Sequence, residues 1–116
     1  MSIFNLMMKL LILGAGVSHI PIIKTAQKLG LFTVVMDKNP KALGLKIADK
    51  PICTNGAEKN EVFRVAKEQK VDGILSTGDY SVIPAAYASQ KLGLPSIGYD
   101  IAQTLLNLVI ILKHKI

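Results

Sequence analysis

The sequence predicts a single α/β domain: an open, doubly wound parallel sheet with helices on both faces, in three αβα layers. The 116-residue chain is 50% hydrophobic, with three Phe, three Tyr and no Trp, so its core is aliphatic. Aliphatic strands buried on both faces are typical of parallel sheets. Short apolar runs also alternate with segments of helical spacing, as successive βαβ units require. A chain of this length is expected to form one domain.

The first predicted strand is Lys9–Leu13, which is too short for a stable helix and stops at a glycine. The turn Gly14-Ala15-Gly16 follows it. The next segment, Ser18–Leu29, has helical spacing, with Ser18 as the expected N-cap and Gly30 as the stop. Backbone N–H groups are then expected to converge at the first turn of this helix, which makes the turn a candidate anion site.

The second predicted strand is Leu31–Met36, and it ends in the polar turn Asp37–Pro40. Together with the preceding strand and helix it forms a right-handed βαβ unit. Lys41–Asp49 predicts a short irregular helix, which leads into a short strand at Pro51–Thr54.

The rest of the chain continues the alternation. Asn55-Gly56 predicts a turn, and the early Glu58 and Glu61 favour a helix start there because of the helix dipole. The breaks Thr77-Gly78-Asp79 and Gly93 bound the next helix. The expected elements are a helix at Glu58–Lys70, a strand at Val71–Ser76, a helix at Tyr80–Leu92, a strand at Pro95–Ile97 and a terminal helix from Asp100.

Composition argues against several classes of protein. The formal charge is +6, but the 14 basic residues are scattered and do not alternate with aromatic residues, so we expect no nucleic-acid binding. No run reaches the roughly 18 apolar residues of a membrane span. The apolar start contains Lys9 and is used by the first strand, which favours a cytoplasmic protein. Cys53, the single cysteine, excludes an intrachain disulfide and is expected to be a buried, inert thiol.

Three polar loops are expected at the carboxyl ends of the strands, where parallel sheets bind ligands. The candidate binding residues in these loops are Gly14, Ala15, Gly16 and Ser18, then Asp37 and Asn39, then Ser76, Thr77, Gly78 and Asp79. The first loop has two glycines of the dinucleotide fingerprint Gly-x-Gly-x-x-Gly, but His19 stands in place of the third. Asp37 stands where an acidic residue would bind a ribose hydroxyl.

Each of these residues also has a purely structural interpretation. His19 is either a solvent-facing first-turn residue or a ligand contact, and Asp37 is either a turn former or a ligand contact. The Ser76–Asp79 loop either holds a carboxylate or phosphate, or Asp79 only caps the next helix. We expect no catalytic residue, because the sequence has no nucleophile–base pair, no paired carboxylates and no phosphate loop. We also expect no metal site, because His19 has no second histidine near it.

Several short motifs, in this order, resemble the N-terminal (pre-ATP-grasp) domain of the ATP-grasp superfamily, as in the carbamoyl phosphate synthetase large subunit. They are Leu-Ile-Leu-Gly-Ala-Gly, Ala-Gln-Lys-Leu-Gly, Val-Val-Met-Asp-Lys-Asn-Pro with Ala48-Asp49, Ile-Leu-Ser-Thr-Gly-Asp and Lys-Leu-Gly-Leu-Pro-Ser-Ile-Gly. The resemblance implies a Rossmann-like domain over residues 9–107. Residues 1–8 are then an N-terminal extension, and residues 108–116 are an apolar tail.

The resemblance further implies the substrate-side part of a carboxylate–amine ligase. Its small-molecule substrate or anion would be positioned by the three loops, while ATP and magnesium would be held by later domains and no cofactor by this chain. The tail departs from the family pattern, so we expect a truncated or split gene product, inactive alone, that forms a homodimer or binds a separate ATP-grasp chain. Two alternatives are a small Rossmann module that binds NAD(P) or another nucleotide, and a non-catalytic interaction subunit.

Overall fold

The computed structural model describes residues 7–77 and 79–95, and the described part is the expected three-layer αβα fold. Its strands are β1 (Lys9–Leu13), β2 (Phe32–Met36), β3 (Lys50–Ile52) and β4 (Gly73–Ser76). Its helices are the 3-10 turn η2 (Val17–His19), α1 (Ile20–Lys28), α2 (Leu43–Ile47), α3 (Lys59–Gln69) and α4 (Asp79–Leu92). The predicted strand at Pro95–Ile97, the helix from Asp100 and the tail at 108–116 lie wholly or mostly outside the described residues.

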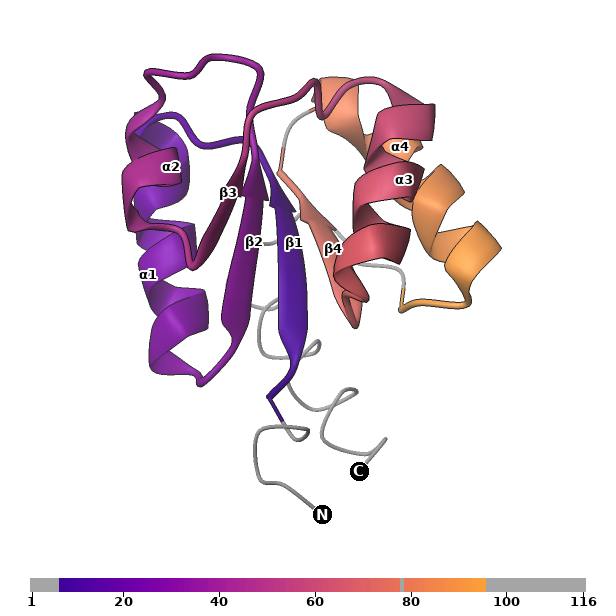
Figure 1. Ribbon diagram of the computed structural model, residues 1–116, viewed down its shortest axis with the longest axis horizontal. Coiled ribbons are helices and arrows are strands. Elements are labelled where there is room, and N and C mark those ends of the chain that lie inside the picture. Colours follow the sequence, from indigo (N-terminus) through magenta and orange to yellow (C-terminus); the bar gives the residue numbers. More distant parts are fainter. Residues whose placement is uncertain (1–6, 78, 96–116) are drawn as a thin grey trace.

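All three strand pairings in the described sheet are parallel, in the order β3-β2-β1-β4. The chain therefore builds outward from β1 to β2 and β3, then crosses to the other side of β1 to form β4. This reversal of strand order is the topological switch point at which doubly wound sheets bind ligands. Figure 1 shows α1 and α2 against one face of the sheet, and α3 and α4 against the other.

Alternate residues of β1 face the two cores, as the pleat of a strand dictates. Leu10 and Ile12 pack with Ile23 and Ala26 of α1 on one face. Leu11 and Leu13 pack on the other face, in a cluster that includes Val62 and Val65 of α3. The strand is buried on both sides, which explains its uninterrupted apolar sequence.

The start of the first helix differs from the prediction. Ser18 is not an N-cap: the chain first makes a 3-10 turn, the N-cap of α1 is His19, and no side chain caps either element. The Ser18 hydroxyl instead lies 3.5 Å from Nδ1 of His19. By contrast, α3 begins close to the expected place, and the Glu58 carboxylate accepts the N–H of Glu61 as an N-cap should.

Cys53 is exposed, so the prediction of a buried thiol is wrong. The third strand ends at Ile52, earlier than predicted, and Cys53 therefore lies in the loop that leaves the sheet. Its thiol is 3.6 Å from the carbonyl oxygen of Lys38 in the neighbouring loop. In the described residues, no helix is long and apolar enough to cross a membrane.

Candidate functional site

The glycine loop after β1 is held by its neighbours through the backbone. Gly14 N–H donates to the carbonyl of Met36 at 2.8 Å, and Ala15 N–H donates to Oδ2 of Asp37 at 2.9 Å. The carbonyl of Ala15 accepts the N–H of Gly44, at the start of α2, at 2.6 Å. The N–H groups of Gly14 and Ala15 are thus already bonded within the protein.

Asp37 fixes two loops at once. Its Oδ2 accepts Ala15 N–H, and its Oδ1 accepts the N–H of Asn39 at 2.9 Å within its own turn. Asn39 in turn accepts the N–H of Lys41 on its side-chain oxygen, at 3.0 Å. The structure therefore shows the turn-forming role for Asp37, and both carboxylate oxygens are engaged by backbone amides.

His19 joins the loop after β1 to the loop after β4. Its Nε2 lies 2.9 Å from the hydroxyl oxygen of Thr77. The ring also covers Gly14, because a Cβ added at Gly14 would lie 2.5 Å from Nε2. Burial lowers the pKa of His19 below its usual value, and the carboxylate of Asp37 opposes that shift. The imidazole is half-buried and contacts Thr77, so it does not face solvent alone.

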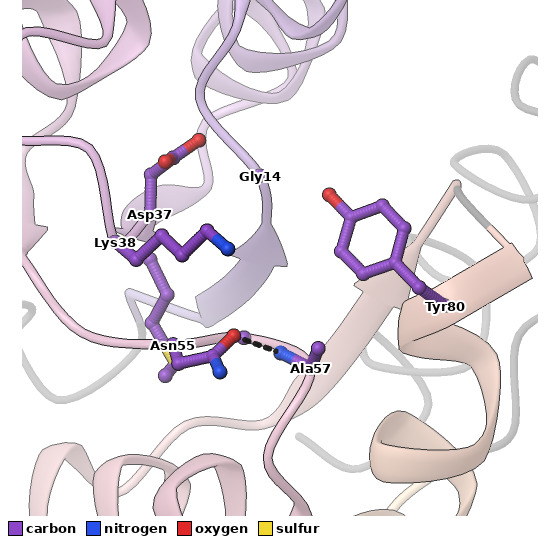
Figure 2. A pocket seen from close by; sticks show the side chains of 8 residues that line it. Gly14, Asp37, Lys38, Asn55, Ala57 and Tyr80 are labelled. Atoms are coloured by element: carbon purple, nitrogen blue, oxygen red, sulfur yellow. Dashed lines mark hydrogen bonds between the residues drawn. The ribbon is translucent and has the colours of Figure 1, made fainter.

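These contacts surround a pocket of about 330 Å³ at the carboxyl ends of the strands. Its wall is formed by residues from four separate segments: Gly14; Met36, Asp37 and Lys38; Asn55, Gly56 and Ala57; and Tyr80. Figure 2 shows the Lys38 and Tyr80 side chains extending toward each other across the pocket. The volume is at the lower end of the range for small-molecule sites.

Only some of the predicted site residues line the pocket. Gly14 and Asp37 line the pocket, whereas Thr77 contacts His19, and neither of these two residues is among the lining residues. Ala15, Gly16, Ser18 and Asn39 lie in the expected loops but are not among its lining residues. Ser76 is buried, with its hydroxyl against that of Ser81 on α4. Gly78 and the side chain of Asp79 are outside the part of the chain that the structure describes.

Sequence reasoning missed the pocket residues after β3 and at the start of α4. The loop Asn55–Ala57 follows the third strand, so the rule that selected the other three loops also applied to it. Lys38 adjoins the predicted Asp37, and Tyr80 was assigned only to a helix. Among residues 7–77 and 79–95, no group of three or more His, Cys, Asp or Glu side chains could hold a metal ion.

Comparison with known proteins identifies a matching family. Residues 23–96 match the model of the ATP-grasp N-terminal domain. No curated protein sequence matches the chain significantly. Among solved structures, phosphoribosylglycinamide synthetase from Anaerococcus prevotii is similar, with a TM-score of 0.69 and 26% identity over 80% of this chain.

Two further structures share the fold at lower identity. N5-carboxyaminoimidazole synthetase from Staphylococcus aureus, complexed with ADP, has a TM-score of 0.65 and 23% identity over 83% of this chain. L-amino acid ligase from Bacillus licheniformis has a TM-score of 0.59 and 20% identity over 79%. The chain spans only about a quarter of the length of these proteins, between 24% and 25% in each case.

Proposed function

The chain belongs to the ATP-grasp N-terminal domain family, and from this premise we propose that it is the substrate-side domain of an ATP-dependent carboxylate–amine ligase. The observation that carries the proposal is the pocket at the carboxyl ends of the strands, built by loops from four parts of the chain. A pocket of this kind at a switch point is where a doubly wound sheet holds a small ligand. Three similar structures are named as synthetases or ligases.

The division of labour follows from the residues present. ATP with magnesium needs a phosphate cradle and carboxylate ligands. Among the described residues no acidic cluster could hold a metal ion, and the Gly14 and Ala15 amides at the pocket are bonded within the protein. We therefore propose that ATP and magnesium bind to another part of the ligase, or to a separate ATP-grasp chain. This chain would bind the substrate other than ATP.

The finer assignment to a carbamoyl phosphate synthetase-like ligase rests on sequence motifs alone. The similar structures include a phosphoribosylglycinamide synthetase and an N5-carboxyaminoimidazole synthetase, which are different ligases. We therefore propose the ligase class without choosing a member. The homodimer remains a prediction, because the residues from which it was inferred, 108–116, lie outside the described part of the chain.

The geometry argues against an NAD(P)-binding module. His19 stands at the third position of the fingerprint, where glycine allows close packing of helix and strand, and its ring covers Gly14. Both oxygens of Asp37 already accept backbone N–H groups, so part of the accepting capacity of the carboxylate is used within the protein. A pure interaction subunit would not need a pocket at the switch point.

Calorimetry on the purified chain with ATP–magnesium, NAD and NADP tests the proposal. We expect no saturable binding of any of the three, and we expect small carboxylates or amines to perturb the amide NMR signals of Gly14 and Gly56 in the pocket. Micromolar binding of NAD or NADP would contradict the ligase assignment. Tight binding of ATP–magnesium to this chain would contradict the substrate-side role.

A further inference from the structure

The pocket carries one positive charge, that of Lys38, which has no ion-pair partner among the described residues. Neither ion pair found among residues 7–77 and 79–95 involves Lys38; both belong to Arg64. The nearest acidic group lining the pocket is Asp37, whose two oxygens each accept a backbone N–H. Lys38 is exposed at the pocket mouth, and its ammonium group is free to meet a ligand.

Two neutral donors stand beside this charge. The hydroxyl of Tyr80, a side chain on a residue that is 61% exposed, faces the pocket from the first turn of α4 and has no hydrogen-bond partner in the described residues. The side-chain oxygen of Asn55 accepts the N–H of Ala57 at 2.9 Å. That bond orients the carboxamide and leaves its NH₂ group as a donor.

We infer that Lys38, Tyr80 and Asn55 form a subsite for one carboxylate group of a small-molecule ligand. This inference rests on the proposed function and names the ligand class of the same pocket. A carboxylate has two oxygens and a single charge, which matches one ammonium group and neutral donors. The apolar surface of Ala57, which is exposed, is then available to the remainder of the ligand.

The same residues fit a phosphate monoester less well. Sites for phosphate usually combine more positive charge with a row of free backbone amides at a glycine loop or helix start. Here the N–H groups of Gly14 and Ala15 already donate to Met36 and Asp37. The residues of η2, where the helical segment begins, do not line the pocket. The pocket is lined by a single basic residue and by no arginine.

NMR titration of the intact chain tests the inference without requiring catalysis. The probes are succinate and L-glutamate as carboxylates, and inorganic phosphate and ribose 5-phosphate as phosphates. We expect the carboxylates to shift the amide signals of Lys38, Gly56 and Ala57, and to bind more tightly than either phosphate. Tighter binding of both phosphates would overturn the choice of carboxylate, and shifts confined to other surfaces would overturn the site.

Variants with matched controls identify the residues. Lys38→Met should weaken carboxylate binding at least tenfold, and Tyr80→Phe should weaken it severalfold. Lys41→Met, a lysine of the same loop outside the pocket, and Tyr87→Phe, a tyrosine of the same helix outside it, should leave binding unchanged. Equal losses in Lys38→Met and Lys41→Met would show a nonspecific charge effect and overturn the inference.

The two proposals can fail separately. Binding of NAD or NADP would contradict the proposed ligase function. A loss of carboxylate binding in Lys38→Met would still support the subsite. Conversely, carboxylate binding that is unchanged in Lys38→Met and Tyr80→Phe would remove the subsite while leaving the family assignment and the pocket intact.

Discussion

Nε2 of His19 and the hydroxyl oxygen of Thr77 lie 2.9 Å apart, and this contact joins the loops that follow β1 and β4. The two residues are 58 positions apart in the chain, and their strands are neighbours in the sheet. The switch point of the fold is therefore bridged by a side-chain hydrogen bond. On the other side of β1, Asp37 makes the corresponding connection from the loop after β2.

Removal of either partner should show that the contact stabilises the folded protein. We expect His19→Ala and Thr77→Val to be non-additive, with a coupling of about 0.5–1.5 kcal/mol in the free energy of unfolding, typical of a net hydrogen bond. Urea unfolding of the two single variants and the double variant measures this coupling. Strict additivity would mean that the two side chains do not interact in solution.

The half-buried imidazole of His19 should make stability depend on pH in mildly acidic solution. Burial lowers the pKa of His19 below 6.5, so the folded protein favours the neutral ring and the unfolded chain binds more protons between the two pKa values. This contribution to stability is complete above about pH 6.5 and is lost as the pH falls toward the lowered pKa.

NMR titration of the His19 ring signals measures that pKa directly, and urea unfolding between pH 5 and 7.5 measures its effect on stability. The His19→Gln variant is the control, because it retains His114 and all acidic residues. The variant should lose this part of the pH dependence. A His19 pKa at or above 6.5 would contradict the burial argument.

Substitution by alanine should destabilise the protein at the first glycine of the loop, Gly14, but not at the second, Gly16. Gly14 has a φ of +119°, and an added Cβ would lie 2.5 Å from the His19 ring, so Gly14→Ala should destabilise by about 1–3 kcal/mol. Gly16 has a φ of −69° and nothing within 4 Å of the added Cβ, so Gly16→Ala should change stability by less than about 0.5 kcal/mol. Thermal unfolding of the pair gives the comparison.

A larger substitution at Gly16 distinguishes an effect on ligand binding from an effect on stability. Gly16→Val should also fold normally, because the space beside Gly16 is open in the protein. If the proposed ligand extends along the loop, this larger side chain weakens binding without changing the melting temperature. Equal destabilisation of the Gly14→Ala and Gly16→Ala variants would contradict the geometry of the turn.

The order of elements was predictable because each signal is local. Lys9–Leu13 and Phe32–Met36 are short apolar runs bounded by glycine or polar turns, and Gly30 ends the first helical segment with a φ of +83°. The rule for carboxyl ends of strands then placed Gly14 and Asp37 near each other, and the hydrogen bond from Ala15 to Asp37 confirms that these two loops meet.

The composition of the pocket was not predictable in the same way, since it depends on which side chains the loops turn inward. Ser76 and Thr77 are adjacent, yet the Ser76 hydroxyl is buried against Ser81 and the Thr77 hydroxyl reaches His19. Tyr80 enters the pocket only because α4 begins beside it. Such orientations are set by tertiary packing, which no local pattern contains.

Gly44 illustrates a constraint that only the packed structure reveals. It lies on the short helix α2, and an added Cβ would be 2.7 Å from the carbonyl oxygen of Ala15 and 2.8 Å from Cδ1 of Ile23. The carbonyl is backbone and cannot rotate away, so helix and glycine loop must separate to admit a methyl group. Gly44→Ala should therefore destabilise the protein by about 1–3 kcal/mol, although alanine is normally the better helix former.

The variant should also disturb the site, because Gly44 N–H donates to Ala15 and the loop cannot shift without straining the bond from Ala15 to Asp37. Amide NMR shifts at Ala15 and Asn39 measure this effect, and urea unfolding measures the loss of stability. Gly56→Ala is the matched control: its Cβ would meet the nearest atom, Cβ of Leu13, at an ordinary 3.6 Å. A Gly44→Ala protein as stable as the Gly56→Ala protein would mean that α2 is not packed against the glycine loop in solution.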